Sequence, residues 1–365
     1  MLIRLIMHKA FAFLSRYYTR KFYIHMYYLE LKKKKYKYFH VLNNGLHSRG
    51  ILDFINNNFN QDEHCFLIPL LKNENVDLLQ LPNVYKYPLV SIPVEQAEKI
   101  IFHGLFTRPF IDFLYERRQY LKKAYWFIWG GDLYTKDDKV STYVKSNMKG
   151  ILTAFDYDVY KEKFKENKCF DVTYPAKWPS EEDLNYTKEG NTVSILINNS
   201  ADETTLEMMD ILAKYKDEDI RICTVLSYIT VGQKDVRLQI MQKGYELFGS
   251  KFQPLINFMP ADEYTQFLNS IDIYISNQDR QQGNGNASYL LALGKKIFVK
   301  SDTSVYQRYQ KEGIVYFDTY SIPELTFDEF KAYDEDVKQK SIEIMKVRSA
   351  EETKVKQWRD FFEAE

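Results

Sequence analysis

Short apolar runs of strand length alternate with amphipathic helical segments along most of the chain, and this alternation predicts parallel α/β sheets. In the first half, a polar turn follows the apolar run at 38–42, and residues 51–59 then have helical periodicity. Further apolar runs lie at 65–71, 90–92, 100–102 and 124–129, with a helical stretch at 110–122. The first half therefore predicts strands joined by helices, as in a doubly wound sheet.

A Pro-containing, charged stretch at 174–191 interrupts the alternation and predicts a linker. A second cycle follows, with strands expected at 192–197, 220–226, 255–259, 271–276 and 296–299 and helices at 203–214, 234–248, 261–270 and 286–293. We expect an N-terminal Rossmann-like domain at 38–180, a C-terminal one at 190–325, and a charged helical tail at 326–365. Two such domains facing a central cleft make the GT-B architecture, although two-domain dehydrogenases and binding proteins share this pattern.

Residues 1–37 differ from the rest of the chain because they are basic and amphipathic. Residues 1–40 hold ten Lys and Arg and the single acid Glu30, so this segment carries +9 and the remaining 325 residues carry −9. Apolar side chains recur at helical spacing, at positions 3, 6, 10, 13, 14 and 17. This pattern is typical of a helix in the headgroup region of an anionic membrane, and it also fits an ordinary helix packed on its domain.

Composition and missing motifs disfavour several functions. The 50 basic and 50 acidic residues cancel, which disfavours a protein that coats nucleic acid. The three cysteines lie far apart without a CxxC pair, which disfavours a disulfide framework and a zinc site. The sequence contains no GxGxxG loop, P-loop, GxSxG elbow or HExxH helix. No apolar stretch reaches the roughly 18 residues of a spanning helix and no secretory signal is visible, which predicts a cytoplasmic protein.

Two strand ends in the second half carry polar residues suited to binding a diphosphate. Asn198, Asn199 and Ser200 lie where a predicted strand passes into a helix, although a simple helix cap also explains them. The loop 276–286 is more specific, because Arg280 supplies charge and Gly283 and Gly285 let the backbone approach a ligand. The other candidate ligand contacts in this loop are Gln281, Gln282 and Asn286.

Strand ends of the first half also carry candidate residues. Asp132 follows a predicted strand and two glycines, so we expect it to act as general base for an acceptor hydroxyl, although a Gly-Asp turn explains it too. His47 and His103 are the alternative bases. The candidates for holding an acceptor sugar are Asn44, Arg49, Arg108, Trp129, Gly130 and Gly131.

Several of these motifs, in the same order along the chain, resemble those of the bacterial TDP-N-acetylfucosamine:lipid II N-acetylfucosaminyltransferases, glycosyltransferase family 56. The motifs are HVLNN at 40–44, FHG at 102–104, WGGDLY at 129–134, LINNSA at 196–201, LSY at 226–228, FMP at 258–260 with EY at 263–264, RQQ at 280–282 with GN at 285–286, and LGKK at 293–296. The resemblance runs from about His40 to Val315, so it covers both predicted domains and leaves the basic N-terminal extension outside.

The resemblance implies a metal-independent GT-B glycosyltransferase without a cofactor, which moves a 4-acetamido-4,6-dideoxyhexose from a dTDP- or UDP-sugar to an undecaprenyl-diphosphate-linked glycan. With residues 1–37 at the membrane, it implies a peripheral protein on the cytoplasmic face of the bacterial inner membrane. Arg280 and the helix N-terminus at Gly285 and Asn286 would stabilise the departing diphosphate. Further donor contacts would come from Asn198, Asn199, Ser200, Tyr228, Glu263, Tyr264, Gln281 and Gln282. The alternatives are a GT-B-fold epimerase or pyruvyl transferase and a non-catalytic sugar-binding relative.

Overall fold

The chain folds into two compact units. The computed structural model describes residues 2–43, 46–70, 73–175, 178–198, 202–227, 234–280 and 282–365, and of residues 2–16, 46–47, 73–76 and 234 it describes the backbone alone. The first unit comprises Met1–Pro175 and Val355–Glu365, and the second comprises Ala176–Lys354. The residues expected as a separate tail, 326–365, therefore divide between the two units.

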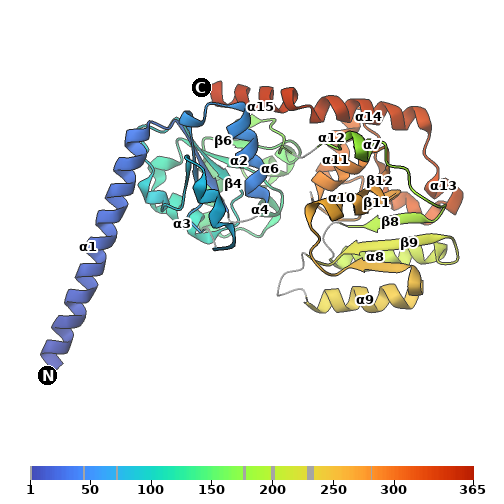
Figure 1. Ribbon diagram of the computed structural model, residues 1–365, viewed down its shortest axis with the longest axis horizontal. Helices are drawn as coiled ribbons and strands as arrows, with labels where there is room; N and C mark the ends of the chain where they lie inside the picture. Colours follow the sequence, from blue (N-terminus) through green and yellow to red (C-terminus); the bar gives the residue numbers. More distant parts are fainter. Residues whose placement is uncertain are drawn as a thin grey trace. The chain divides into compact units, whose positions relative to one another are not determined.

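The first unit contains a parallel sheet of seven strands in the order β3-β2-β1-β4-β5-β6-β7. Figure 1 draws this sheet, with β4 and β6 labelled, among the helices of its unit. The strands are β1 (Tyr38–Leu42), β2 (His64–Leu67), β3 (Val84–Tyr85), β4 (Lys99–His103), β5 (Ala124–Phe127), β6 (Gly150–Leu152) and β7 (Cys169–Phe170). The helices are α1 (Leu2–Lys34), α2 (Leu46–Asn58), α3 (Arg108–Glu116), α4 (Gly131–Tyr134), α5 (Lys139–Asn147), α6 (Tyr157–Lys163) and most of α15 (Glu351–Glu363). The strand order reverses between β1 and β4, and α/β sheets bind ligands at the carboxyl ends of such strands.

The second unit contains a parallel sheet of six strands in the order β10-β9-β8-β11-β12-β13. The strands are β8 (Val193–Ile197), β9 (Ile220–Val225), β10 (Phe252–Leu255), β11 (Ile273–Ser276), β12 (Lys296–Val299) and β13 (Phe317–Asp318). The helices are α7 (Glu181–Leu184), α8 (Glu203–Leu212), α9 (Lys234–Phe248), α10 (Ala261–Asn269), α11 (Asn284–Ala292), α12 (Ser304–Lys311), α13 (Phe327–Lys331) and α14 (Glu335–Ser349). Here the order reverses between β8 and β11.

Side chains of the first sheet alternate between two apolar layers, as the pleat of a strand requires. In β4, Ile100 packs into one layer and Ile101 into the other. Helix α15 covers the second layer with the buried residues Trp358, Phe361 and Phe362. Lys99 holds the end of α15, because its ammonium group donates to the carbonyl oxygens of Phe362 (3.0 Å) and Ala364 (2.6 Å). The segment 355–365 thus contributes buried side chains to the core of the first unit.

Two expected strands differ from the structure. The strand expected at 90–92 is a 3-10 turn, Leu89–Ser91, because prolines flank it and the Ser91 N–H donates to the Pro88 carbonyl oxygen (2.9 Å). The strand expected at 255–259 lies earlier, where Phe252 to Leu255 pair with β9. The other strands expected in the second unit overlap the observed ones.

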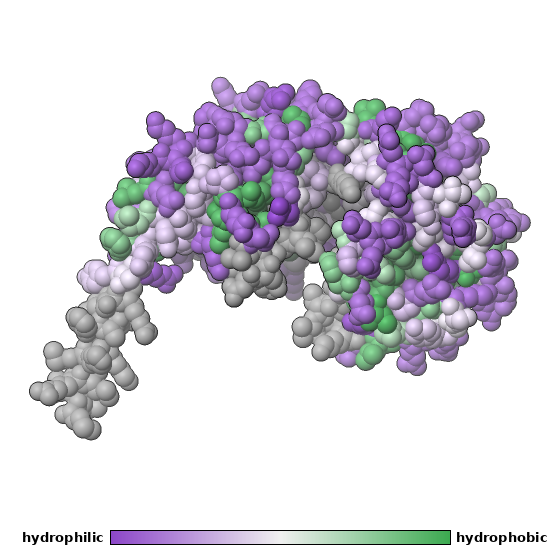
Figure 2. All heavy atoms as spheres, viewed as in Figure 1, coloured by the Kyte–Doolittle hydropathy of each residue, from purple (hydrophilic) through white to green (hydrophobic). Residues whose placement is uncertain are grey.

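Hydrophilic residues cover most of the face drawn in Figure 2, and apolar residues appear there in scattered groups. No helix among the described residues is both long enough and apolar enough to cross a membrane.

Candidate functional site

A small pocket in the second unit lies at the carboxyl end of β11, beside the first turn of α11. Its polar lining residues are Ser276, Gln278, Arg280, Gln282, Asn284 and Thr303. Strand β11 is one of the two strands at which the order of this sheet reverses. The pocket therefore brings together Arg280 and Gln282, two of the residues that the sequence predicted for the donor. Thr303 was not predicted, because it resembles an ordinary N-cap and accepts from the Tyr306 N–H.

Hydrogen bonds from the end of β8 and the start of α8 fix the loop that carries Arg280. Asn198 accepts from the Asn277 backbone N–H (2.8 Å), and its amide group donates to the Thr205 hydroxyl (3.0 Å). Gln278 donates to the Asp202 carboxylate (2.9 Å). Asn198 is fully buried, and through these hydrogen bonds it positions this loop.

The pocket presents polar atoms and open space near the N-terminus of α11. Gln282 Oε1 and Asn284 Nδ2 are buried and have no hydrogen-bond partner in the part of the chain that the structure describes. Gly283 lies between them with φ of +67°, a left-handed conformation that glycine adopts without strain. Apart from its chain neighbours and the backbone of α11, no atom of the described residues lies within 4 Å of the place where a Cβ on Gly285 would lie. A ligand can therefore approach this backbone closely, and Arg280 contributes a positive charge beside it.

The other donor candidates are not part of the pocket lining or lie outside the described residues. The Asn286 amide group donates to the Tyr264 hydroxyl, which joins α11 to α10. Glu263 is exposed in the first turn of α10. The candidates outside the described residues are Asn199, Ser200, Tyr228 and Gln281. Among the residues with described positions, no three His, Cys, Asp or Glu side chains gather in a way that would hold a metal ion.

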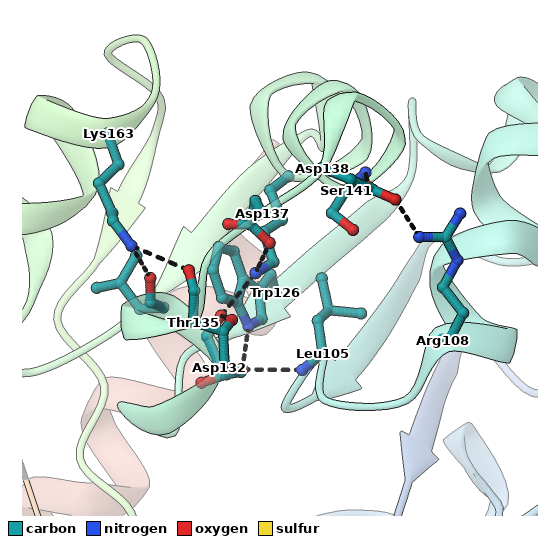
Figure 3. A network of polar contacts seen from close by, with 11 residues as sticks. Leu105, Arg108, Trp126, Asp132, Thr135, Asp137, Asp138, Ser141 and Lys163 are labelled. Carbon is teal, nitrogen blue, oxygen red and sulfur yellow. Dashed lines mark hydrogen bonds and ion pairs between the residues drawn. The ribbon is translucent and has the colours of Figure 1, made fainter.

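In the first unit, Asp132 lies in the interior, where three N–H groups hold its carboxylate. Figure 3 shows two of these donors, the Leu105 backbone N–H and the Trp126 indole N–H. Oδ2 accepts from the Leu105 backbone N–H (2.8 Å) and the Trp126 indole N–H (2.6 Å), and Oδ1 accepts from the Trp129 backbone N–H (3.0 Å). The Lys145 ammonium group donates to the Asp132 carbonyl oxygen (2.6 Å). Asp132 therefore joins the segments that follow β4 and β5.

This environment contradicts the expected role of Asp132 as the acceptor base. The residue is 0% exposed, so an acceptor hydroxyl does not reach its carboxylate in this structure. Burial raises the pKa of Asp132, and the three N–H donors oppose that rise because they stabilise the ionised form. A buried carboxylate that satisfies three donors is a structural group, since each donor would lose its partner without it.

His103, an alternative base, is also buried and belongs to a chain of three histidines across β4, β1 and β2. His40 Nδ1 lies 3.0 Å from His103 Nε2, and His40 Nε2 lies 3.0 Å from His64 Nδ1. The ring of Trp358 in α15 stacks near His103. Burial lowers the pKa of His64 and of His103 to about 3, and it lowers the pKa of His40 between them. The three rings are therefore neutral at neutral pH, and His103 is not open to an acceptor.

The histidine chain makes the first unit sensitive to acid. The pKa of about 3 in the folded state lies below the ordinary value of 6.5, so the unfolded chain binds more protons between these pH values and stability falls as the pH falls. Lowering the pH from about 7.5 to about 5.5 should remove about 1.4 kcal/mol for each of His64 and His103. Urea unfolding followed by tryptophan fluorescence measures this, because Trp126, Trp129 and Trp358 all lie in the first unit.

The control for this experiment is His25→Gln, since His25 is exposed on α1 and its loss should leave the pH dependence unchanged. A free energy of unfolding that stays constant over this pH range would contradict the buried, neutral histidine chain.

The acceptor candidates follow the carboxyl ends of β1, β4 and β5. Arg49 pairs with Asp53 (3.0 Å) and Asp77 (3.2 Å), and Arg108 pairs with Asp112 (2.7 Å) and Asp138, so both arginines are already neutralised at the surface.

The remaining acceptor candidates form the turn after β5 or are described in part. The Trp129 ring contacts the Tyr174 ring edge-on, with centroids 6.0 Å apart. Gly130 adopts φ of +91°, a conformation that favours glycine, and Gly131 begins α4. Asn44 lies outside the described residues, and of His47 only the backbone is described, in the first turn of α2.

Solved structures share this fold at low sequence identity. HepE of Anabaena, in complex with UDP and glucose, is 12% identical with a TM-score of 0.59, and the match covers 90% of this chain and 99% of HepE. A glycosyltransferase from Rickettsia africae ESF-5 is 12% identical with a TM-score of 0.62, over 90% of this chain and 97% of that one. The N-terminal domain of trehalose-6-phosphate phosphatase from Candida albicans is 8% identical with a TM-score of 0.63, over 89% and 96%. The fold is therefore GT-B.

The family model described as 4-alpha-L-fucosyltransferase, glycosyl transferase group 56, matches residues 37–360. This range includes most of both units and excludes the whole of α1. The match leaves the epimerase, pyruvyl transferase and non-catalytic alternatives without support. The chain belongs to glycosyltransferase family 56 and is a glycosyltransferase.

Proposed function

We propose that the protein transfers a 4-acetamido-4,6-dideoxyhexose from a dTDP- or UDP-sugar to an undecaprenyl-diphosphate-linked glycan, in the synthesis of a bacterial surface polysaccharide similar to enterobacterial common antigen. Membership of a fucosyltransferase family supports transfer of a deoxyhexose, and the UDP and glucose bound to HepE support a nucleotide-sugar donor. The observation that carries the proposal is the pocket of the second unit, where Arg280 lies beside the N-terminus of α11.

In the proposed reaction, an acceptor hydroxyl oxygen attacks the anomeric carbon of the sugar, and the bond from this carbon to the nucleoside diphosphate breaks. The diphosphate gains negative charge as it leaves. Arg280 and the N–H groups of the first turn of α11 would stabilise this charge, so we propose a reaction that requires neither a cofactor nor a bound metal. Gln282 and Asn284 would hydrogen-bond the sugar or the diphosphate with their buried amide atoms.

The acceptor hydroxyl must lose its proton to a base. We propose His47 for this role, because Asp132 and His103 are buried and His47 lies in the first turn of the helix after β1, at the ligand-binding edge of the sheet.

The protein would meet a lipid-linked acceptor at the cytoplasmic face of the inner membrane. We propose that residues 1–37 contact this membrane surface.

A nucleotide screen by thermal unfolding tests the donor site. We expect dTDP or UDP to stabilise the protein, by about 2.7 kcal/mol at a concentration of 100 times the Kd, and GDP and CMP to have little effect. Adding magnesium should change this stabilisation little, since Arg280 and α11 neutralise the diphosphate. The nucleotide that binds then indicates which nucleotide sugars to test with an undecaprenyl-diphosphate-linked acceptor.

Equal stabilisation by all four nucleotides would contradict a selective donor pocket. An absence of stabilisation by any of them would contradict the proposed donor, and stabilisation only with magnesium would contradict the proposed metal independence.

A further inference from the structure

Helix α1 joins the first unit through its last turns. Leu31 is fully buried in the core, and the ring of Tyr27 stacks on the ring of Tyr87 with centroids 4.0 Å apart. The Tyr87 hydroxyl also donates to the Glu30 carboxylate (2.7 Å). Figure 1 shows the N-terminal part of α1 extending away from the sheet of its unit. These contacts fix the direction in which α1 leaves the first unit.

The opposite side of α1 carries an exposed apolar stripe. Its members recur at spacings of three and four residues, which brings them to one side of a helix. They are Tyr18, Phe22, Met26 and Leu29, with exposed fractions of 66%, 61%, 47% and 44%. At 100° per residue this stripe lies roughly opposite Leu31. Because the stripe is exposed in the isolated chain, a partner is needed to remove this area from water.

The charge of α1 indicates the chemistry of that partner. Exposed basic residues lie along α1 and at its end: Arg20, Lys21, Lys33, Lys34 and Lys35. At 100° per residue Lys33 lies on the side of the stripe and Lys21 beside it, whereas Arg20 lies on the opposite side. Glu30, the only acid in residues 1–40, is held by Tyr87. A second copy of α1 would bring two such basic helices together, which charge repulsion disfavours. A bilayer that contains anionic lipid attracts these bases and accepts aromatic and apolar side chains at the level of its headgroups.

We propose that the stripe formed by Tyr18, Phe22, Met26 and Leu29 binds the surface of an anionic lipid bilayer. Helix α1 then lies in the headgroup region, and its contacts with Tyr87 set the orientation of the first unit above the lipid. This inference deepens the proposed function and depends on it, because the proposed lipid-linked acceptor would lie in such a membrane surface. Binding itself requires no catalysis, so it is tested separately.

Sedimentation of the full chain with vesicles tests the inference. We expect the protein to bind vesicles that mix phosphatidylcholine with phosphatidylglycerol, to bind phosphatidylcholine alone much less, and to dissociate as salt is raised. Combining Phe22→Asp with Leu29→Asp should lower the partition coefficient at least about a hundredfold, because two apolar contacts are lost and two negative charges are added. The control is Leu238→Asp, which changes an exposed leucine of α9 (64% exposed) and should bind as the wild type does.

Several outcomes would overturn this inference. Failure of the wild-type protein to bind the anionic vesicles would contradict it, and so would a double variant that binds them as well as the wild type. A wild-type dimer in solution that the double variant abolishes would also overturn it, because the stripe would then bind a second copy of the chain. Thermal unfolding with dTDP and UDP separates this inference from the proposed donor. A double variant that loses vesicle binding and retains nucleotide stabilisation supports the inference, and vesicle binding without any nucleotide stabilisation contradicts the proposed function alone.

Discussion

Replacing Arg280 by alanine should lower kcat by about a hundred- to a thousandfold, because the departing diphosphate loses its charged partner in the pocket at the moment when its negative charge increases. The Arg280→Lys variant should retain part of the rate, since an ammonium group keeps the charge and loses the planar, two-pronged geometry of the guanidinium group. Transfer of labelled sugar to the lipid-linked acceptor, with donor at saturation, measures kcat.

Arg359→Ala is the matched control for this experiment, because it removes a positive charge from an exposed position of α15. We expect it to have the kcat of the wild type. A rate for Arg280→Ala close to that of the wild type would contradict the role assigned to Arg280. Loss of nucleotide stabilisation in the same variant would show that the arginine also holds the donor in the ground state.

Replacing Asp132 by alanine should lower the free energy of unfolding of the first unit by about 3–5 kcal/mol. The change leaves the Leu105 and Trp129 backbone N–H groups and the Trp126 indole N–H without their acceptor in the interior. Each buried donor that loses its partner costs about 1–3 kcal/mol. Urea unfolding followed by tryptophan fluorescence measures the loss.

Asp112→Ala is the control for Asp132→Ala, since Asp112 is half exposed and pairs with Arg108. Its loss should cost no more than about 1 kcal/mol. If Asp132→Ala unfolds as the wild type does and yet loses most of its transfer rate, Asp132 is the catalytic base after all and the structural role is wrong.

The long elements and the family could be predicted from the sequence, because apolar periodicity and local motifs carry that information. Runs such as 193–197 and 273–276 are strand-like by themselves, and the loop 276–286 concentrates polar residues and glycine at a strand end. The alternation of strands and helices predicts that each sheet is parallel, but it indicates the order of the strands within each sheet only in outline. The expected donor loop contributes Arg280 and Gln282 to the pocket of the second unit.

Burial decided the cases that the sequence misjudged. Asp132 and His103 both follow the local pattern of a catalytic residue at a strand end, but the sequence alone does not show that N–H donors surround one of them and that α15 covers the other. Thr303 has only the local pattern of a helix cap. The short strands Val84–Tyr85 and Cys169–Phe170 contain two residues each, too few for periodicity to distinguish them from a loop.

The position of α15 has a consequence for synthesis. The ribosome makes Met1–Pro175 first, then the whole of Ala176–Lys354, and only then the residues that complete the core of the first unit. Until Trp358 and Phe362 emerge, one face of the first sheet, with His40, His64 and His103, lacks its cover. We therefore expect the nascent first unit to remain incompletely folded, and dependent on chaperones, until translation has passed through the second unit.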